Sequence, residues 1–563
     1  MKFRLLFASV FTIGILISFV FFVLLLVMFS TGLIGGVTLV VLTIIINIVT
    51  WLVSPWIMDL VHKLFYKFEI ITIDDLAKRS PYTAKFLAET CERNGMKLPM
   101  LRIVDDLNPT AYCYGSVPSN SRIVVSEGLF HYLTDEEVAA VYAHELGHIK
   151  HLDFIVMTVA NTLLMILYEI YVVFTRMRSS GKNNPLPLIG LISLIFWLIG
   201  TYVVLYLSRT REYMADRFSA LETKNPNALS TALVKIAYGI AAQPDEAGSN
   251  RLLASTRSMG VSDYKSAETV GGIVRLSATE QVRSTEKVPA FDPQRVSKVF
   301  LFDIYNPWSR IVQLGSTHPL TGKRIKAMMD VACELKVPPM FNFDEIQVYG
   351  QALDKGRLYR NFFFEVLIYF APIITLILGL IPALFNPYLI GLALLSFGLG
   401  LLLKGIYKFP PLSEPQERTV LELMSDPYAS PLRGQPVSVE GTVVGRAAAG
   451  SFFGEDMVIH DRSGGLMTLN YESIIPVVGN LFFGISRTKK LINQTVRGVG
   501  WFRRKVSQVV DLKNIITKEK TYTSYNRLRA IFFGILITGA GVVTAVLSVV
   551  AVLTAGGTTQ GAF

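Results

Sequence analysis

Long apolar runs alternate with polar stretches along this chain. A helix needs about 20 consecutive apolar residues to cross the hydrocarbon core of a bilayer. We interpret seven runs as membrane spans: residues 5–29, 32–53, 154–175, 185–207, 362–385, 388–403 and 531–553. A cleaved signal peptide is the alternative for the first run, but its apolar part is too long and a second run follows at once. The pattern predicts a mainly α-helical, polytopic membrane protein.

The spans divide the chain into successive parts. We expect a transmembrane hairpin, a mixed α+β domain interrupted by the third and fourth spans, a second hairpin, a β-rich polar domain, a last span and a short tail. In the same order, these parts cover residues 1–53, 54–360, 361–404, 405–529, 530–553 and 554–563.

The charges beside the spans predict their orientation. Lys2 and Arg4 precede the first span, so the positive-inside rule places the N-terminus in the cytoplasm. Seven spans then place the C-terminus outside and all the large polar parts on the cytoplasmic face. Arg176, Arg178 and Lys182 lie between the third and fourth spans, against this rule. This leaves open whether those two spans are shallow or tilted or cross the bilayer fully.

Composition narrows the class further. Hydrophobic residues make up 51% of the 563 residues, charged residues only 17%, and the sequence has a net charge of +11. In so apolar a chain the positive charge fits cytoplasmic loops beside a lipid bilayer and argues against a nucleic-acid partner. Cys91, Cys113 and Cys333 are too few for a disulfide framework and form no CxxC metal site.

A metal-binding pattern lies just before the third span. His144 and His148 are four residues apart, so on a helix both imidazoles point to one side and can bind one zinc ion. Glu145 lies beside them, where it can accept a proton from a water molecule on the ion. Thr134 suits the N-cap of this helix, and three acidic residues follow it in the first turn. The alternative is a chance match on a polar helix.

A third ligand is expected because a catalytic zinc ion has three protein ligands and one open position. Glu212 follows the fourth span, and Asp216 lies one helical turn later, where its carboxylate can accept a hydrogen bond from a zinc-bound imidazole. The alternative is a charged surface helix. It is disfavoured because this segment leaves an apolar run as the His144 helix enters one, so both meet at the same membrane face.

These motifs carry a resemblance to a known family. HELGH at 144–148, SRTREYMAD at 208–216 and STHPLTGKRI at 316–325 resemble the integral-membrane zinc peptidases of the HtpX type, which are related to the CAAX prenyl proteases. The resemblance covers residues 1–335. It implies a zincin-like, gluzincin-type fold with one catalytic zinc ion.

The resemblance also implies roles for two further residues. His318 is expected near the scissile carbonyl, where it stabilises the oxyanion, with Arg324 supporting it. The alternative is a turn histidine before a helix that starts near Thr321.

Two predicted strands, residues 101–105 and 121–126, precede the zinc helix. The resemblance implies that Ala111, Tyr112 and Cys113 belong to an edge strand that pairs with an extended substrate. Tyr112 and Cys113 depart from the family, in which a Phe and a small residue are more usual. The alternative is an ordinary buried strand. The polar stretch 243–289 is expected to be a flexible loop, and whether it gates the site stays open.

The β-rich part after the second hairpin predicts a five-stranded barrel of OB type. Its expected strands are residues 438–444, 457–461, 466–471, 496–502 and 506–512. Basic residues lie close to the apolar segment 474–485, which favours contact with a membrane surface over nucleic acid. They are Arg487, Lys489, Lys490, Arg497, Arg503, Arg504 and Lys505. A solvated charged face is the alternative.

Three functions follow as hypotheses. The first is a membrane-embedded zinc metalloendopeptidase that cuts membrane or misfolded polypeptides at the cytoplasmic face, and the resemblance implies protein quality control. The second is a processing protease for prenylated or signal peptides. The third is a non-enzymatic scaffold or transporter with a structural zinc ion. It is disfavoured because structural zinc usually has four protein ligands, and because acidic residues inside the expected spans are few: Glu365, which lies near an end, and Glu169. The substrate, the oligomeric state and the partner of the β-rich domain stay open.

Overall fold

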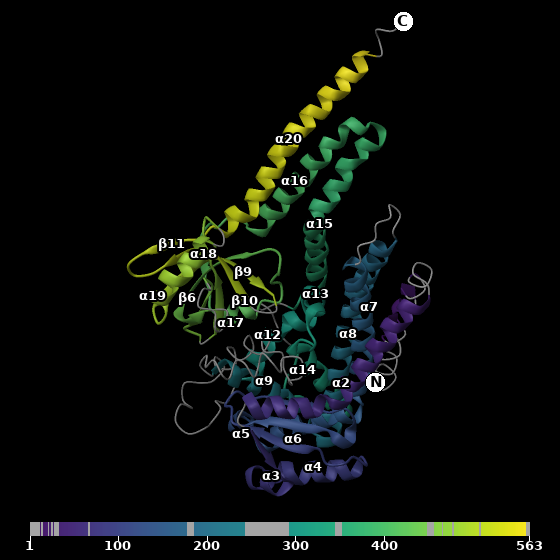
Figure 1. Ribbon diagram of the computed structural model, residues 1–563. Helices are drawn as coiled ribbons and strands as arrows, with labels where there is room; N and C mark the ends of the chain where they lie inside the picture. Colours follow the sequence, from purple (N-terminus) through teal and green to yellow (C-terminus); the bar gives the residue numbers. More distant parts are fainter. Residues whose placement is uncertain are drawn as a thin grey trace. The chain divides into compact units, whose positions relative to one another are not determined.

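The computed structural model describes most of the chain as two compact units (Figure 1). The first unit comprises residues 1–297 and 312–343, and the second comprises residues 298–311 and 344–563. The described residues are 12, 15–20, 22, 23, 26, 33–65, 68–176, 185–242, 292–343, 352–446, 455–463, 465–475, 478–505 and 508–558. The predicted loop 243–289 lies outside them, as does most of the predicted first span.

A four-stranded sheet forms one layer of the first unit. Its strands are β1 (Phe68–Ile71), β2 (Met100–Val104), β3 (Ala111–Tyr114) and β4 (Arg122–Ser126), in the order β1-β2-β4-β3. The β2–β4 pair is parallel, and the other pairs are antiparallel. The two strands expected from the sequence correspond to β2 and β4, and β3 lies at an edge of the sheet.

Helices complete the first unit. α6 (Asp135–Lys150) starts at a capping box, in which the Thr134 hydroxyl accepts from the Glu137 backbone N–H and the Glu137 carboxylate accepts from that of Thr134. The helix is buried on almost every side, so it forms the centre of the unit. The others are α2 (Leu33–Phe65), α3 (Ile73–Arg79), α4 (Pro81–Arg93), α5 (Glu127–Tyr132), α7 (Asp153–Arg176), α8 (Leu186–Thr223), α9 (Pro226–Ala242) and α14 (Thr321–Glu334). α12 (Pro293–Tyr305) and α13 (Trp308–Val312) lie mostly in the second unit.

Six helices among the described residues are long and apolar enough to cross a membrane. They are α2, α7, α8, α15 (Lys355–Phe385), α16 (Gly391–Lys408) and α20 (Asn526–Thr558). Each corresponds to a run predicted from the sequence, and the seventh predicted run, 5–29, lies mostly outside the described residues. The expected fourth span and the expected Glu212 helix form one continuous helix, α8, because no glycine or proline interrupts the chain at their junction. α2 also continues past its expected end at Val53 to Phe65.

The second unit joins a helical part to a β domain. α15, α16 and α20 run side by side (Figure 1). Glycines allow α16 and α20 to approach closely, since a Cβ atom at Gly398 would lie 2.5 Å from the Thr538 nitrogen and one at Gly541 would lie 2.4 Å from the Leu395 Cα. Such close contact of small residues is a common way to pack helices in a bilayer.

The β domain contains the five strands expected from the sequence and two short additional ones. They are β6 (Gln435–Arg446), β7 (Met457–Asp461), β8 (Leu466–Asn470), β9 (Thr495–Arg504) and β10 (Gln508–Ile516), with β5 (Gln416–Glu417) and β11 (Thr521–Thr523) at the margins. The pairings β6–β7, β7–β8, β8–β10, β10–β9 and β9–β6 close a ring, in which only β8–β10 is parallel. The short helices are α17 (Val420–Met424), α18 (Val478–Phe483) and α19 (Lys489–Leu491), with a π-helical turn, η5 (Gly484–Thr488), between the last two.

Candidate metal centre and active site

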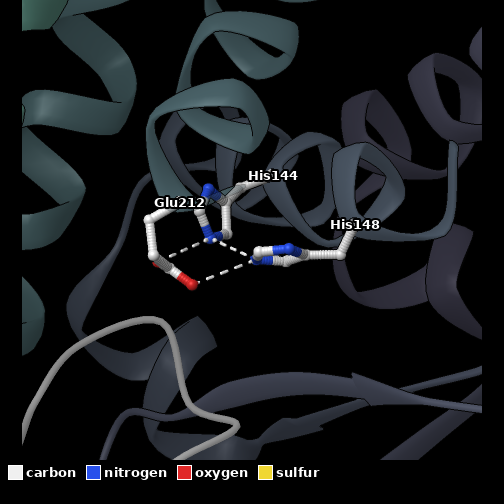
Figure 2. Close-up of side chains that lie close together, drawn as sticks. All are labelled: His144, His148 and Glu212. Carbon is white, nitrogen blue, oxygen red and sulfur yellow. Dashed lines mark hydrogen bonds and ion pairs between the residues drawn. The ribbon is translucent and has the colours of Figure 1, made fainter. Parts of the chain in front are cut away.

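Two helices bring three potential metal ligands together (Figure 2). The Nε2 atoms of His144 and His148 on α6 are 3.2 Å apart. The carboxylate of Glu212 on α8 faces both, with Oε2 at 3.7 Å from His144 Nε2 and Oε1 at 3.5 Å from His148 Nε2. The three residues that the sequence proposed as ligands therefore point at one another.

Close packing between α6 and α8 makes this meeting possible. A Cβ atom at Gly147 would lie 2.8 Å from the Cα of Ala215, so a larger residue there would push the helices apart. One turn away, the Ser219 hydroxyl donates to the Ala140 carbonyl at 2.6 Å and fixes the same interface. Glu212 lies on the same face of α8, two helical turns before Ser219, where it faces the histidines.

Asp216 orients the first histidine. Its Oδ1 lies 3.0 Å from His144 Nδ1, which leaves His144 Nε2 facing Glu212. Arg324 on α14 holds this carboxylate through two hydrogen bonds, from Nε at 2.9 Å and from Nη2 at 2.6 Å. The Arg324 Nη1 atom is also 3.5 Å from Glu212 Oε2. Arg324 thus touches both carboxylates of the centre, and their negative charges outweigh burial and raise the pKa of its guanidinium above the usual range.

A second aspartate, which sequence reasoning missed, orients the other histidine. Asp153 Oδ2 lies 2.6 Å from His148 Nδ1, and the Asp153 carboxylate pairs with Arg211. Asp153 lies five residues after His148, beyond the end of α6. Leu152 adopts a left-handed conformation with φ of 59°, and this sharp turn lets Asp153 begin α7 beside the preceding helix. The signal in the sequence was the acidic residue at the first position of an apolar run.

Glu145 is buried beside the two histidines. Neither of its carboxylate oxygens has a hydrogen-bond partner among the described residues. Burial raises the pKa of this carboxyl group, and the nearby imidazoles of His144 and His148 oppose the shift. A carboxylate whose pKa is raised toward neutrality is suited to general-base chemistry.

His318 also reaches the centre. Its Nε2 lies 3.6 Å from Glu212 Oε1, and its Nδ1 is 2.9 Å from the hydroxyl of Thr317. Two residues of α8 hold the preceding loop: Ser208 donates to the Thr317 carbonyl, and Arg209 Nη1 donates to the carbonyls of Gln313, Leu314 and Ser316 at 2.7–3.2 Å. The helix after this loop, α14, begins at Thr321, where the sequence placed it.

The edge strand β3 contacts α6. The thiol of Cys113 contacts the Glu145 carbonyl at 3.6 Å, whereas the Tyr112 hydroxyl lies 3.1 Å from His62 Nε2 on α2. Ala111, Tyr112 and Cys113 are all buried. Burial also raises the pKa of the Cys113 thiol well above its usual value.

The donor set fits a divalent metal ion. One ligand atom from each of His144, His148 and Glu212 lies within 4.8 Å of the others. Glu212 Oε2 and both Glu145 oxygens are buried without hydrogen bonds among the described residues, which is costly unless another group binds them. Burial lowers the pKa of His148, but Asp153, Glu212 and Glu145 raise it to about 9.

Comparisons with known proteins agree with this geometry. Residues 78–332 match peptidase family M48. A "Protease HtpX homolog" of Methanothermobacter thermautotrophicus is 34% identical over 188 residues, which are 33% of this chain and 67% of that protein. One of Pyrococcus abyssi is 31% identical over 223 residues, 38% of this chain and 74% of that protein. One of Aeropyrum pernix is 29% identical over 320 residues, 54% of this chain and 90% of that protein.

A solved structure is also similar. The crystal structure of S. mikatae Ste24p gives a TM-score of 0.33 at 17% identity, over 55% of this chain and 62% of that one. The family match contains both helices of the metal centre, and apolar helices long enough to cross a membrane accompany it. The chain is a membrane metalloprotease and belongs to peptidase family M48.

Proposed function

We propose that His144, His148 and Glu212 bind one catalytic zinc ion and that the protein is an endopeptidase acting at the cytoplasmic face of the membrane. The observation that carries the proposal is the convergence of these three ligands beside the unpaired carboxylate of Glu145. Two imidazoles and one glutamate are a ligand set of catalytic zinc. Such an ion would polarise the scissile carbonyl and make a water molecule acidic enough to ionise near neutral pH.

Glu145 is the proton carrier in this proposal. Its carboxylate accepts the proton of the attacking water and afterwards donates it to the leaving amine. The raised pKa of its carboxyl group favours both steps, because a group that titrates closer to neutrality can both take up and release a proton. Its burial also keeps competing bulk water away from the reacting atoms.

His318 and Arg324 have different parts in the proposal. The position of His318 Nε2 near Glu212 supports a role as hydrogen-bond donor to the developing oxyanion. Arg324 contacts Asp216 and Glu212, so we assign it to positioning the ligands. This differs from a direct catalytic role for Arg324.

The substrate would bind as an additional strand. β3 is the outer strand of the four-stranded sheet, next to α6, and its backbone is the part that would pair with an extended polypeptide. Ala111 and Cys113 alternate with Tyr112, whose side chain points to α2. Main-chain hydrogen bonds to β3 would give affinity without reading the side chains of the substrate.

Substrates of this kind suit protein quality control. Backbone pairing accepts many sequences, and the similar proteins from Methanothermobacter and Pyrococcus are protease HtpX homologs. The cytoplasmic placement of the site rests on the basic residues that flank the spans. We also assign the closed ring of β6 to β10 to the OB type, because its five strands form a Greek-key barrel with one parallel pair.

A processing protease for prenylated or signal peptides is the second candidate, and one observation favours it. A groove of about 290 Å³ lies between two membrane helices of the first unit. Its lining is almost wholly apolar: Ile44, Ile48 and Trp51 of α2, and Ile155, Thr158, Val159, Thr162, Leu163 and Ile166 of α7. An isoprenoid chain or an apolar signal segment would fit such a groove. Competition between casein and a prenylated peptide for cleavage would distinguish the two functions.

The test of the proposed function compares the purified protein with its Glu145→Gln variant in detergent. Bound zinc and cleavage of casein are measured for both, and Glu136→Gln, an exposed change in the same helix, is the control. We expect one zinc ion per chain in all three proteins and casein cleavage by all except Glu145→Gln. Equal cleavage by Glu145→Gln would refute the assigned base, and absence of zinc from the unmodified protein would refute the metal centre.

A further inference from the structure

The α18 helix of the β domain carries an apolar face that points outward. Val478, Leu481 and Phe482 follow the i, i+3, i+4 spacing of one face of α18, and Ile485 follows in the π-helical turn η5; their exposed fractions are 62, 42, 72 and 47%. Ile474 and Ile475, just before the helix, are exposed by 65 and 62%. We call these six residues the apolar stripe. In a soluble domain such a face normally packs against the core.

Residues on the opposite face of α18 hold the helix in the orientation that exposes the apolar stripe. Asn480 is buried, accepts a hydrogen bond from the Ser473 N–H at 2.7 Å and donates to Glu455 and Glu472. Phe483 is buried and stacks on Tyr471 with ring centroids 3.7 Å apart. Polar and aromatic anchors therefore hold the helix so that the apolar stripe faces away from the barrel.

Basic side chains accompany the apolar stripe. Arg487 and Lys520 lie on the ring of Tyr522, at 5.6 and 5.7 Å from its centroid. With α18 and β11 residues they line a cleft of about 380 Å³. Arg487, Lys490 and Lys520 are exposed. Cations beside an exposed apolar helix face are typical of helices that lie in the interface of an anionic membrane.

The apolar stripe is also tied to a membrane helix. The Glu472 carbonyl accepts from the Tyr525 N–H at 2.8 Å, and the Glu472 carboxylate pairs with Arg529 in the first turn of α20. Asn526, the first residue of α20, donates to the Asn470 carbonyl at 2.9 Å. The start of α20 is thus fastened to the segment that leads into α18, so the apolar stripe lies where this membrane helix begins.

We propose that the apolar stripe inserts into the interfacial layer of the bilayer and that Arg487, Lys490 and Lys520 contact the phosphates of anionic lipids. The β domain would then be held against the membrane surface by α18 as well as by α20. The proposal does not depend on the peptidase function. A lipid surface is favoured over a second copy of the chain because Arg487 and Lys520 line one cleft with Ile474 and Phe482 of the apolar stripe and because the membrane helix α20 begins beside it.

The test measures the depth of single labels in full-length protein in vesicles. Cys333, the exposed cysteine, is changed to serine, and a fluorophore is placed at Phe482→Cys or, as the matched control, at Arg462→Cys. Arg462 is exposed and lies at the other end of β8 from α18. Quenchers are carried on the lipid acyl chains near the headgroups. Vesicles contain phosphatidylcholine alone or a mixture with phosphatidylglycerol.

We expect the label at position 482 to lose most of its fluorescence to the lipid quencher and the label at 462 to lose little. Adding Arg487→Glu and Lys490→Glu should abolish any stronger quenching in the anionic vesicles. Equal and weak quenching at both positions would overturn the proposal. So would a label at 482 that is shielded from aqueous quencher but not reached by the lipid quencher, because a protein would then cover it. Thermal unfolding of each labelled variant verifies that the domain is folded.

Discussion

Each of the two histidines of the metal centre is supported by a chain of contacts that consists of an aspartate and then an arginine. The two chains come from different parts of the sequence. His144 contacts Asp216, which pairs with Arg324, and His148 contacts Asp153, which pairs with Arg211. The first chain joins α6 to α8 and α14, far apart in the sequence. The second joins α6 to Asp153, just after the turn that directly follows α6, and to Arg211 on α8. His144 is fully buried, whereas 15% of the His148 side chain is exposed.

This difference shows that one histidine ligand is held in the interior, whereas the other lies closer to solvent. The buried chain ties three helices to one ligand, and through Arg324 it also reaches Glu212. The second chain also reaches α8 through Arg211, but its aspartate lies only five residues after the histidine, and it orients the ligand on the more open side. A carboxylate behind a metal-binding imidazole fixes its ring and raises its basicity, so both chains should affect metal affinity. They should differ in how strongly they affect folding.

The largest effect is expected from a substitution that leaves both supporting chains intact. Glu145→Gln should lower the rate of peptide cleavage by roughly 10²–10⁴-fold, because a proton-transfer group is lost. Zinc content should be unchanged, since all three ligands and both aspartates remain. Steady-state cleavage of a fluorogenic peptide and metal analysis of the same sample check this prediction. A variant that loses zinc as well would show that Glu145 supports the ligands. Glu145 would then be a third support of the metal centre, beside the two chains.

Sequence reasoning placed Asp216 behind a zinc-binding imidazole but expected Arg324 to support His318, and it missed Asp153 for a physical reason. Asp216 lies one helical turn after Glu212, so helix periodicity alone places both on one face. Asp153 lies beyond the end of α6, and its approach to His148 depends on the left-handed conformation of Leu152, which no periodicity predicts. The role of Arg211 could not be predicted either, because its partner Asp153 had not been identified.

The fold shows the same limit. Apolar runs identified the membrane helices and alternation identified the strands of the β domain, because each depends on local pattern. The apolar runs did not indicate where these helices end, because α8 continues past the expected end of the span at Leu207 to Thr223, and α2 continues past Val53 to Phe65.

The next effect should come from the buried chain. Asp216→Asn should weaken zinc binding by about 100-fold, the upper end for such supporting groups. It should also lower the free energy of unfolding by about 3 kcal/mol, because the buried Arg324 loses its paired carboxylate. Competition with a zinc chelator and thermal unfolding of the metal-loaded protein measure the two quantities. Unchanged stability would show that Glu212 alone satisfies Arg324.

Asp153→Asn should have a smaller effect. Zinc binding should weaken by about ten-fold, and stability should change less than in Asp216→Asn, because Arg211 also donates to the carbonyl of His151. The same two measurements apply, with Glu169→Gln on α7 as a control change in the same helix. If the loss of affinity matched that of Asp216→Asn, the open and the buried ligand would need equal support, and the distinction drawn between the two chains would be wrong.

The smallest effect concerns the loop that carries His318. Arg209→Lys keeps a positive charge but cannot reproduce the hydrogen bonds to three carbonyls. Cleavage should slow by a few-fold, the equivalent of about 1 kcal/mol, with zinc affinity unchanged because neither histidine chain is touched. The effect should disappear in a His318→Ala background, since Arg209 would act only by positioning that histidine. An undiminished effect in this background would place the role of Arg209 in the folding of α8 instead.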